Sequence, residues 1–74
     1  MIIEVTWRIT DRARQPHSGV IYYEEDAIPP KDKVVAHLQT FISHLDPFSV
    51  RVKKSDLSAD DLVSKGISFY RNAL

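Results

Sequence analysis

The stretch from Pro29 to Asp46 constrains the fold more than any other, because its apolar residues fit a single periodic structure. Counted from the first, they fall at offsets of 0, 1, 4, 7, 8 and 11: Val34, Val35, Leu38, Phe41, Ile42 and Leu45. These offsets place them on one side of a helix with a period of about 3.6 residues. Pro29 and Pro30 suit the start of a helix, and Pro47 marks its end. A helix with one apolar side must lie on an apolar surface, which strands on either side of it can supply.

Residues 2–10 alternate in the manner of a β-strand with one buried face. One side carries Ile3, Val5, Trp7 and Ile9, and the other carries Glu4, Thr6, Arg8 and Thr10. Period two, with β-branched and aromatic residues, is typical of such a strand. Residues 11–19 are predicted to form a loop that is long for a hairpin, so part of it can extend the strands.

Val20–Asp26 is predicted to be the second strand. Its register is ambiguous, since its first four residues are all apolar. The side that carries Tyr22 is the more polar one, because two acidic residues share it. We therefore expect Ile21 and Tyr23 to point inward and Tyr22 to point outward.

A third strand is predicted at Phe48–Lys54, where apolar and polar residues alternate again. The residues expected to point inward are Phe48, Val50 and Val52, and those expected to point outward are Ser49, Arg51 and Lys53. This strand would supply a further part of the apolar surface beneath the helix.

A second helix is predicted from Ala59 to about Ala73. Ser58 can accept a hydrogen bond from the N–H of Asp61, and acidic residues suit the positive end of the helix dipole. The apolar residues that the helix would present are Leu62, Val63, Ile67, Tyr70 and Leu74. Gly66 would lie inside this helix, at a cost of about 1 kcal/mol relative to alanine.

The order of elements is strand, strand, helix, strand, helix, which defines an α+β fold. A right-handed crossover makes the third strand parallel to the second. We expect a small two-layer sandwich: a three-stranded, mostly antiparallel sheet in the order 2-1-3, with both helices on one face. The 74 residues are expected to form one domain, and the thin stability of so short a chain favours self-association.

Composition limits the possible functions. The chain has no cysteine, which rules out disulfides and thiolate metal sites. It shows no signal peptide at its start and no apolar run near the ~20 residues that span a bilayer, so we expect a cytoplasmic protein without a membrane partner. Lysine plus arginine equals aspartate plus glutamate at ten each, which argues against non-specific attraction to nucleic acid as the main activity.

The sequence predicts no catalytic site, no cofactor site and no metal site. His37 and His44 would stand about 10 Å apart along a helix, too far to share one zinc ion, so both are expected in solvent. The acidic run Glu24–Asp26 is expected to be a solvated strand end, since neighbours in a strand point to opposite faces. With two glycines in the chain, there is no phosphate-binding loop, and no serine has the setting of a nucleophile elbow. We therefore do not expect an enzyme.

The uncovered face of the sheet is the candidate binding surface. The residues expected to bind a partner are Arg8, Arg12, Arg14, Tyr22, Arg51 and Lys53. Arginine presents forked donors to carboxylates, and an exposed tyrosine among arginines is a composition that protein interfaces favour. The competing interpretation is an ordinary solvated face of mixed charge, because antiparallel sheets commonly leave one face in water.

Three hypotheses of function follow. The first is a small intracellular protein-binding module that acts as a regulator, inhibitor or accessory subunit by docking on a partner protein; small domains of this kind are frequent among the accessory proteins of phages and mobile elements. The second is a nucleic-acid-binding module that uses the same basic and aromatic face, although the glycine-flanked aromatics of RNA-recognition domains are absent. The third is a homodimer paired through the unguarded edge of the second strand at Val20–Tyr23.

Overall fold

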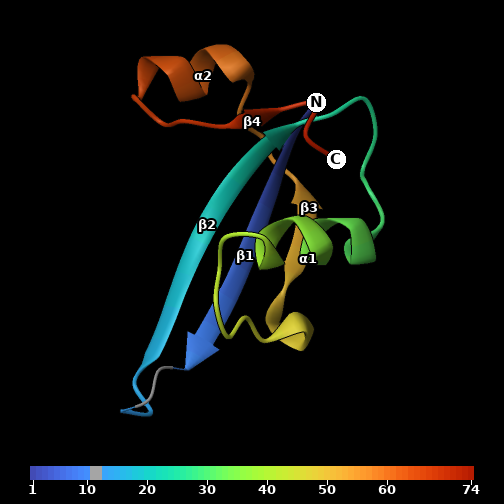
Figure 1. Cartoon of the computed structure of the whole chain (residues 1–74). Helices are drawn as coiled ribbons and strands as arrows, with labels where there is room; N and C mark the ends of the chain where they lie inside the picture. Colours follow the sequence, from blue (N-terminus) through green and yellow to red (C-terminus); the bar gives the residue numbers. More distant parts are fainter. Residues whose placement is uncertain (11–12) are drawn as a thin grey trace.

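The computed structural model describes residues 1–10 and 13–74. Within them the chain forms, in order, β1 (Ile2–Thr10), β2 (Pro16–Glu24), α1 (Lys31–Gln39), the 3-10 helix η1 (Pro47–Ser49), β3 (Arg51–Lys54), α2 (Ala59–Ser64) and β4 (Tyr70–Arg71). The strands make one mixed sheet in the order β3-β1-β2-β4. Figure 1 shows α1 in front of this sheet and α2 at one end of it. The chain is a small α+β domain with one strand that the sequence pattern did not predict.

The hairpin of β1 and β2 is the centre of the sheet. Every residue of β1 pairs antiparallel with β2, from Ile2 opposite Glu24 to Thr10 opposite Pro16. β3 pairs antiparallel with the other side of β1, so the predicted order of the first three strands, 2-1-3, is confirmed. β2 begins earlier than predicted, at Pro16, because its ladder with β1 continues to the end of β1.

The main core lies between α1 and one face of the sheet. Its buried members are Ile3, Val5, Tyr23, Val34, Leu38, Leu45 and Val50, and the side chains packed around them are Trp7, Ile9, Ile21, Val35, Ile42, Val52 and Leu74. Ile21 and Tyr23 thus point inward, as the polarity of β2 predicted. Because strand residues alternate, Tyr22 and its neighbours in the even positions point to the opposite face.

α1 ends well short of Asp46. Thr40 follows its last residue and donates its hydroxyl to the carbonyl of His37 at 2.6 Å, a local bond that competes with continuing helix. The chain then turns, so that Leu45 forms a bridge to Ile9 of β1 and is buried there. The prediction that the helix continues to Asp46 is therefore wrong. The apolar residues after Gln39 keep a helical spacing, but they lie in a turn and in the bridge to the sheet.

The third strand begins later than predicted, because Pro47–Ser49 forms η1. The carboxylate of Asp46 accepts the N–H of Phe48 at 3.0 Å and starts this turn. The turn leaves Phe48 83% exposed and buries Ser49, which reverses the predicted alternation at both positions. From Val50 onward the predicted alternation holds, with Val50 buried.

α2 begins as predicted and ends much earlier. Ser58 and Asp61 form a capping box, in which each side chain accepts the other's backbone N–H, at 3.1 and 2.9 Å. After the helix Gly66 takes a φ of +70°, and the N–H of Ile67 bonds the carbonyl of Leu62 at 2.9 Å. This is the Schellman arrangement, in which a left-handed glycine closes a helix. The predicted continuation to about residue 73 is wrong, because Gly66 stops the helix rather than lying inside it.

The residues beyond Gly66 form an extra strand instead of helix. Tyr70 and Arg71 of β4 pair parallel with Tyr23 and Glu24 of β2. α2 therefore lies at the end of the sheet next to β4 and not beside α1 (Figure 1). Its buried Leu62 is outside the core that α1 covers, although both helices were expected on that face.

Glu25 ties together the first and last residues of the chain. It is buried, and its carbonyl accepts the Met1 ammonium at 2.8 Å. Its carboxylate accepts the backbone N–H of Leu74 at 2.9 Å. The run Glu24–Asp26 was expected to be a solvated strand end. In the structure Glu25 is buried, Glu24 is half-buried, and only Asp26 of these three residues is exposed.

Candidate functional site

The sheet face opposite α1 carries side chains from three strands. They are Glu4, Thr6 and Arg8 of β1, Ser18, Val20 and Tyr22 of β2, and Arg51 and Lys53 of β3. We call this set the open face; in Figure 1 it is turned away from the viewer, behind the ribbons of the sheet. Four of the six residues predicted to bind a partner lie on it, and their positions follow directly from strand alternation.

Glu4 stands at the centre of one half of the open face. Its carboxylate lies 3.0 Å from Lys53 Nζ and accepts a longer hydrogen bond from the Tyr22 hydroxyl at 3.4 Å. The bond to Glu4 raises the pKa of Lys53 above its ordinary value. Burial, followed by the Glu4 charge, raises the pKa of Tyr22. Both predicted binding residues are thus already engaged with a carboxylate of their own chain.

Arg8 and Arg51 share a hollow in the other half of the open face. The hollow has a volume of about 400 Å³, and its lining residues are Thr6, Trp7, Arg8, Ser18, Gly19, Ser49 and Arg51. Arg51 Nη1 donates to the carbonyls of Phe48 and Val50, at 2.8 and 3.3 Å, which fixes the guanidinium beside η1. Neither arginine forms an ion pair with a carboxylate among residues 1–10 and 13–74. The hollow therefore holds two positive charges and no acidic side chain.

Ser49 fixes the wall of this hollow. Its hydroxyl accepts the backbone N–H of Arg8 at 2.9 Å and lies 2.7 Å from the carbonyl of Asp46, to which it donates. The N–H of Asp46 in turn donates to the carbonyl of Arg8 at 3.3 Å. These bonds clamp η1 onto β1 next to the two arginines. Sequence reasoning missed this role, because strand alternation had placed Ser49 in solvent.

Arg14 lies away from the hollow. Arg14 is exposed in the loop of the β1–β2 hairpin, with a φ of +60°, and Figure 1 shows this loop at the far end of the molecule from α2. Arg12 lies outside the described residues. The five predicted residues that the structure describes thus divide into a basic pair at the hollow, a pair held by Glu4, and Arg14 in the hairpin loop.

A cluster of four rings on the α1 face was not predicted. The Tyr23 hydroxyl lies 2.7 Å from His37 Nδ1, and Tyr70 stacks on Tyr23 with 5.4 Å between ring centroids. Phe41 contacts both His37 and Tyr70, at 5.4 and 6.0 Å. Burial raises the pKa of Tyr23 to about 12. The expectation that His37 lies in solvent is wrong; the signal that could have found it is that a buried tyrosine hydroxyl needs a polar partner.

Among residues 1–10 and 13–74, no group of three or more histidine, cysteine or acidic side chains is placed to hold a metal ion. The helices in that part of the chain are too short and too polar to cross a membrane. Comparison with protein-family models, curated proteins and solved structures finds no match to this chain.

Proposed function

We propose that this protein is a small binding module that docks on a partner protein through the open face, as a regulator, inhibitor or accessory subunit. The observation that carries the proposal is the hollow in which Arg8 and Arg51 stand together without a carboxylate. A guanidinium presents forked donors that match the geometry of a carboxylate. Acidic side chains of a partner would supply the charge that the hollow lacks.

The setting of Arg51 supports docking of this kind. Two backbone carbonyls already hold its guanidinium in place, so less side-chain freedom is lost when a ligand binds. Tyr22 lies on the same face and is half-buried. A tyrosine with few rotatable bonds provides flat contact area at a low cost in conformational entropy.

A protein partner fits the open face better than nucleic acid does. Glu4 already pairs with Lys53, and it would repel a phosphate backbone that followed the strands. Proteins that bind single strands stack successive bases on several aromatic rings in a basic groove, whereas Tyr22 is the one aromatic side chain that the described strands place on this face. A face of mixed charge suits a protein surface, where carboxylates and basic groups can both be matched.

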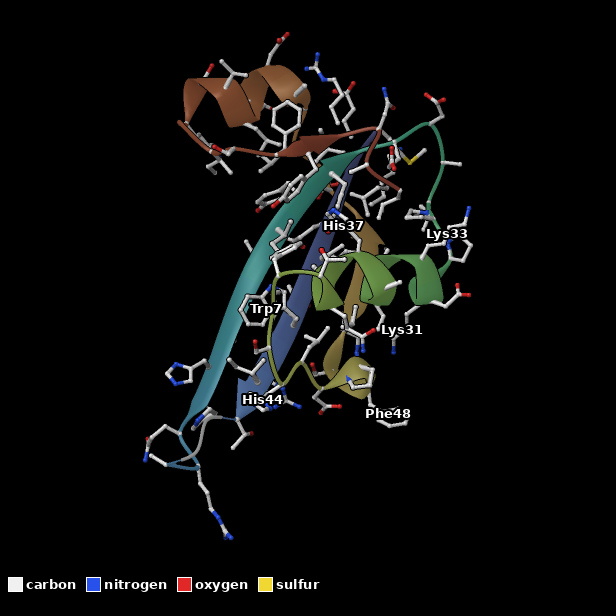
Figure 2. All side chains as sticks on the ribbon, viewed as in Figure 1. Trp7, Lys31, Lys33, His37, His44 and Phe48 are labelled. Atoms are coloured by element: carbon white, nitrogen blue, oxygen red, sulfur yellow. The ribbon has the colours of Figure 1, made fainter. Side chains whose placement is uncertain are left out.

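The test is a capture experiment from lysate of the source cells, with and without nuclease. Wild-type protein is compared with the double variant Arg8→Glu/Arg51→Glu. The matched control is Lys31→Glu/Lys33→Glu, which changes the net charge equally on α1, where Figure 2 shows both lysines. We expect a discrete protein that survives nuclease, remains with the control and is lost with the arginine variant. Circular dichroism should show that all three proteins are folded.

Two results would refute this proposal. If the captured protein stays with the arginine variant, its docking surface lies elsewhere. If nucleic acid is recovered and binding falls steeply with salt, with a slope that tracks the number of phosphate contacts, the nucleic-acid hypothesis replaces the protein one. Failure to capture any protein in the wild-type experiment would leave the open face as an ordinary solvated surface.

A further inference from the structure

The outer edge of β2 is free along most of its length. β4 pairs with Tyr23 and Glu24 only, and within the described residues no strand pairs with that edge from Pro16 to Tyr22. Figure 1 shows β2 running down past β4 with no ribbon beside its outer edge. A free edge of this length is a template for another strand.

The backbone bonds that the structure forms show which groups face this edge. The N–H of Asn72 donates to the carbonyl of Glu24 at 3.1 Å on the β4 side, whereas the N–H of Glu25 donates to Met1 on the β1 side. Because backbone groups alternate in direction along an antiparallel strand, Ser18 and Val20 point their N–H and C=O groups the same way as Glu24. These donors and acceptors are therefore directed at the free edge.

The side chains along this edge do not block pairing with another strand. Natural edges are commonly blocked by lysine, by proline in the interior or by a bulge, but here Val20 lies next to the middle of the free stretch and is 46% exposed. Next to it is a hollow of about 310 Å³, lined by Val20, Ile21, Ser68, Phe69 and Tyr70. Pro16 marks one end of the free edge, and β4 marks the other.

We infer that the edge accepts β2 of a second copy of this chain, in antiparallel orientation. The argument for a second copy is the charge along β2: Arg14 precedes the strand, and at its other end the two acidic residues Glu24 and Asp26 outnumber Arg71, whose Nε lies 3.8 Å from the Glu24 carboxylate. Antiparallel self-pairing brings the basic end of each copy to the acidic end of the other. A parallel pairing would bring like charges together, and Coulomb repulsion disfavours it.

The register follows from the limits of the free edge. A twofold axis at Gly19, the middle residue, places Pro16 of one copy opposite Tyr22 of the other and uses the whole free edge of both. It also places Ser18 opposite Val20, so the groups directed at the edge meet in hydrogen-bonded pairs. Pro16 has no N–H to donate, and it falls at the end of the ladder, where the loss matters least.

Gly19 gives this interface a spectroscopic signal. A Cβ placed on Gly19 would lie 2.3 Å from Cζ2 of Trp7, so the indole lies directly over the glycine; Figure 2 shows the ring over the ribbon of β2. In the proposed dimer the two Trp7 rings approach each other across the paired glycines. Trp7 is the one tryptophan in the chain, so its fluorescence reports the association without a label.

The experiment is sedimentation and Trp7 fluorescence over micromolar to millimolar protein. We expect a monomer–dimer equilibrium, with the fluorescence change following the dimer fraction. Ser18→Pro should weaken the dimer by at least about tenfold, because each copy loses one N–H donor and one or two hydrogen bonds are worth that much. Val20→Lys should also weaken it, because a lysine on an edge strand opposes pairing with another strand. Val63→Lys, the same exchange at an exposed position on α2, should leave the dissociation constant unchanged.

A charge swap tests the orientation. Arg14→Glu should weaken the dimer, and Glu24→Lys in the same chain should restore it, because residues 14 and 24 lie opposite each other in this register and their charges are then reversed and still complementary. A wild-type protein that remains monomeric at millimolar concentration would overturn the inference. So would a dimer that Val20→Lys leaves intact. The inference does not rest on docking through the open face, because it concerns backbone groups of β2 and not the hollow at Arg8 and Arg51.

Discussion

Replacement of Gly66 by alanine separates two accounts of the C-terminal third of the chain. If the helix of residues 59–73 formed, as the apolar pattern predicts, alanine would stabilise it by about 1 kcal/mol relative to glycine. The structure places Gly66 at a φ of +70° just after α2. There the left-handed conformation costs a residue with a Cβ about 1–2 kcal/mol. The two accounts therefore predict effects of opposite sign.

The structure also shows that this cost is a backbone effect alone. Apart from Gly66 itself and its two chain neighbours, no heavy atom of the described residues lies within 4 Å of a Cβ built on Gly66, so alanine meets no steric clash with the rest of the fold. Alanine stiffens the unfolded chain and recovers about 0.4–1 kcal/mol. The net result for Gly66→Ala is a loss of about 1 kcal/mol, which lowers Tm by about 4–8 °C in a domain of this size. Gly66→Asn should lose less, because asparagine tolerates the left-handed region.

Thermal and urea unfolding, followed by circular dichroism at one fixed protein concentration, measure these differences. The control is Ser64→Ala at the last residue of α2, where alanine suits the helical backbone and should be neutral or slightly stabilising. An increase in Tm for Gly66→Ala would refute the C-cap and support a continuous helix. Equal losses of stability for Gly66→Ala and Gly66→Asn would show that the left-handed backbone conformation is not the cause of the loss.

Two further results are expected. Burial raises the pKa of Tyr23 from 10.0 to about 12. A titration followed by phenolate absorbance should therefore show a late phase near pH 12, and Tyr23→Phe should remove it. Because the pKa is higher in the folded than in the unfolded protein, the stability that Tyr23 contributes is full below pH 10 and is lost as the pH rises towards 12. Ser49→Ala leaves the N–H of Arg8 without its side-chain acceptor and should lower the free energy of unfolding, measured in urea, by about 1–3 kcal/mol. The control Ser68→Ala, at an exposed position, should change this free energy by less than about 0.5 kcal/mol.

The central part of the sheet could be predicted because its pattern is local and strictly periodic. Residues 2–10 alternate without interruption, and the structure forms β1 over that range. Glu24 and Asp26, at and just beyond the end of β2, led to the prediction that Tyr22 points outward and Tyr23 inward, as observed. In such strands each side chain's face depends only on its position, so residue order alone is sufficient.

The shortened helices could not be predicted, because long-range contacts and backbone conformation override a helical spacing. Leu45 keeps the spacing of α1 but is buried by a bridge to Ile9, which no local pattern reveals. Gly66 is compatible with a helix interior and with a C-cap, and apolar residues on both sides favoured the wrong choice. β4 has two residues, too few to show any periodicity.

The candidate site was predictable where it depends on strands and not where it depends on turns. Arg8, Arg51, Lys53 and Tyr22 reach the open face by alternation. Which of them remains available to a partner depends on neighbours across the sheet, since Glu4 engages two of them. The clamp at Ser49 and the pairing of Tyr23 with His37 both join residues distant in sequence.

The two outer strands pair only with the central hairpin, β3 with β1 and β4 with β2. The two hairpin strands follow each other in the sequence. The pairings of β3 with β1 and of β4 with β2, in contrast, each join the first third of the chain to its last third. Closing so long a loop costs chain entropy, which is recovered only when a formed strand is ready to receive the incoming one. The hairpin should therefore set the speed of folding. Changes within it should alter the folding rate, and changes in β4, the last strand in the sequence, should alter the rate of unfolding.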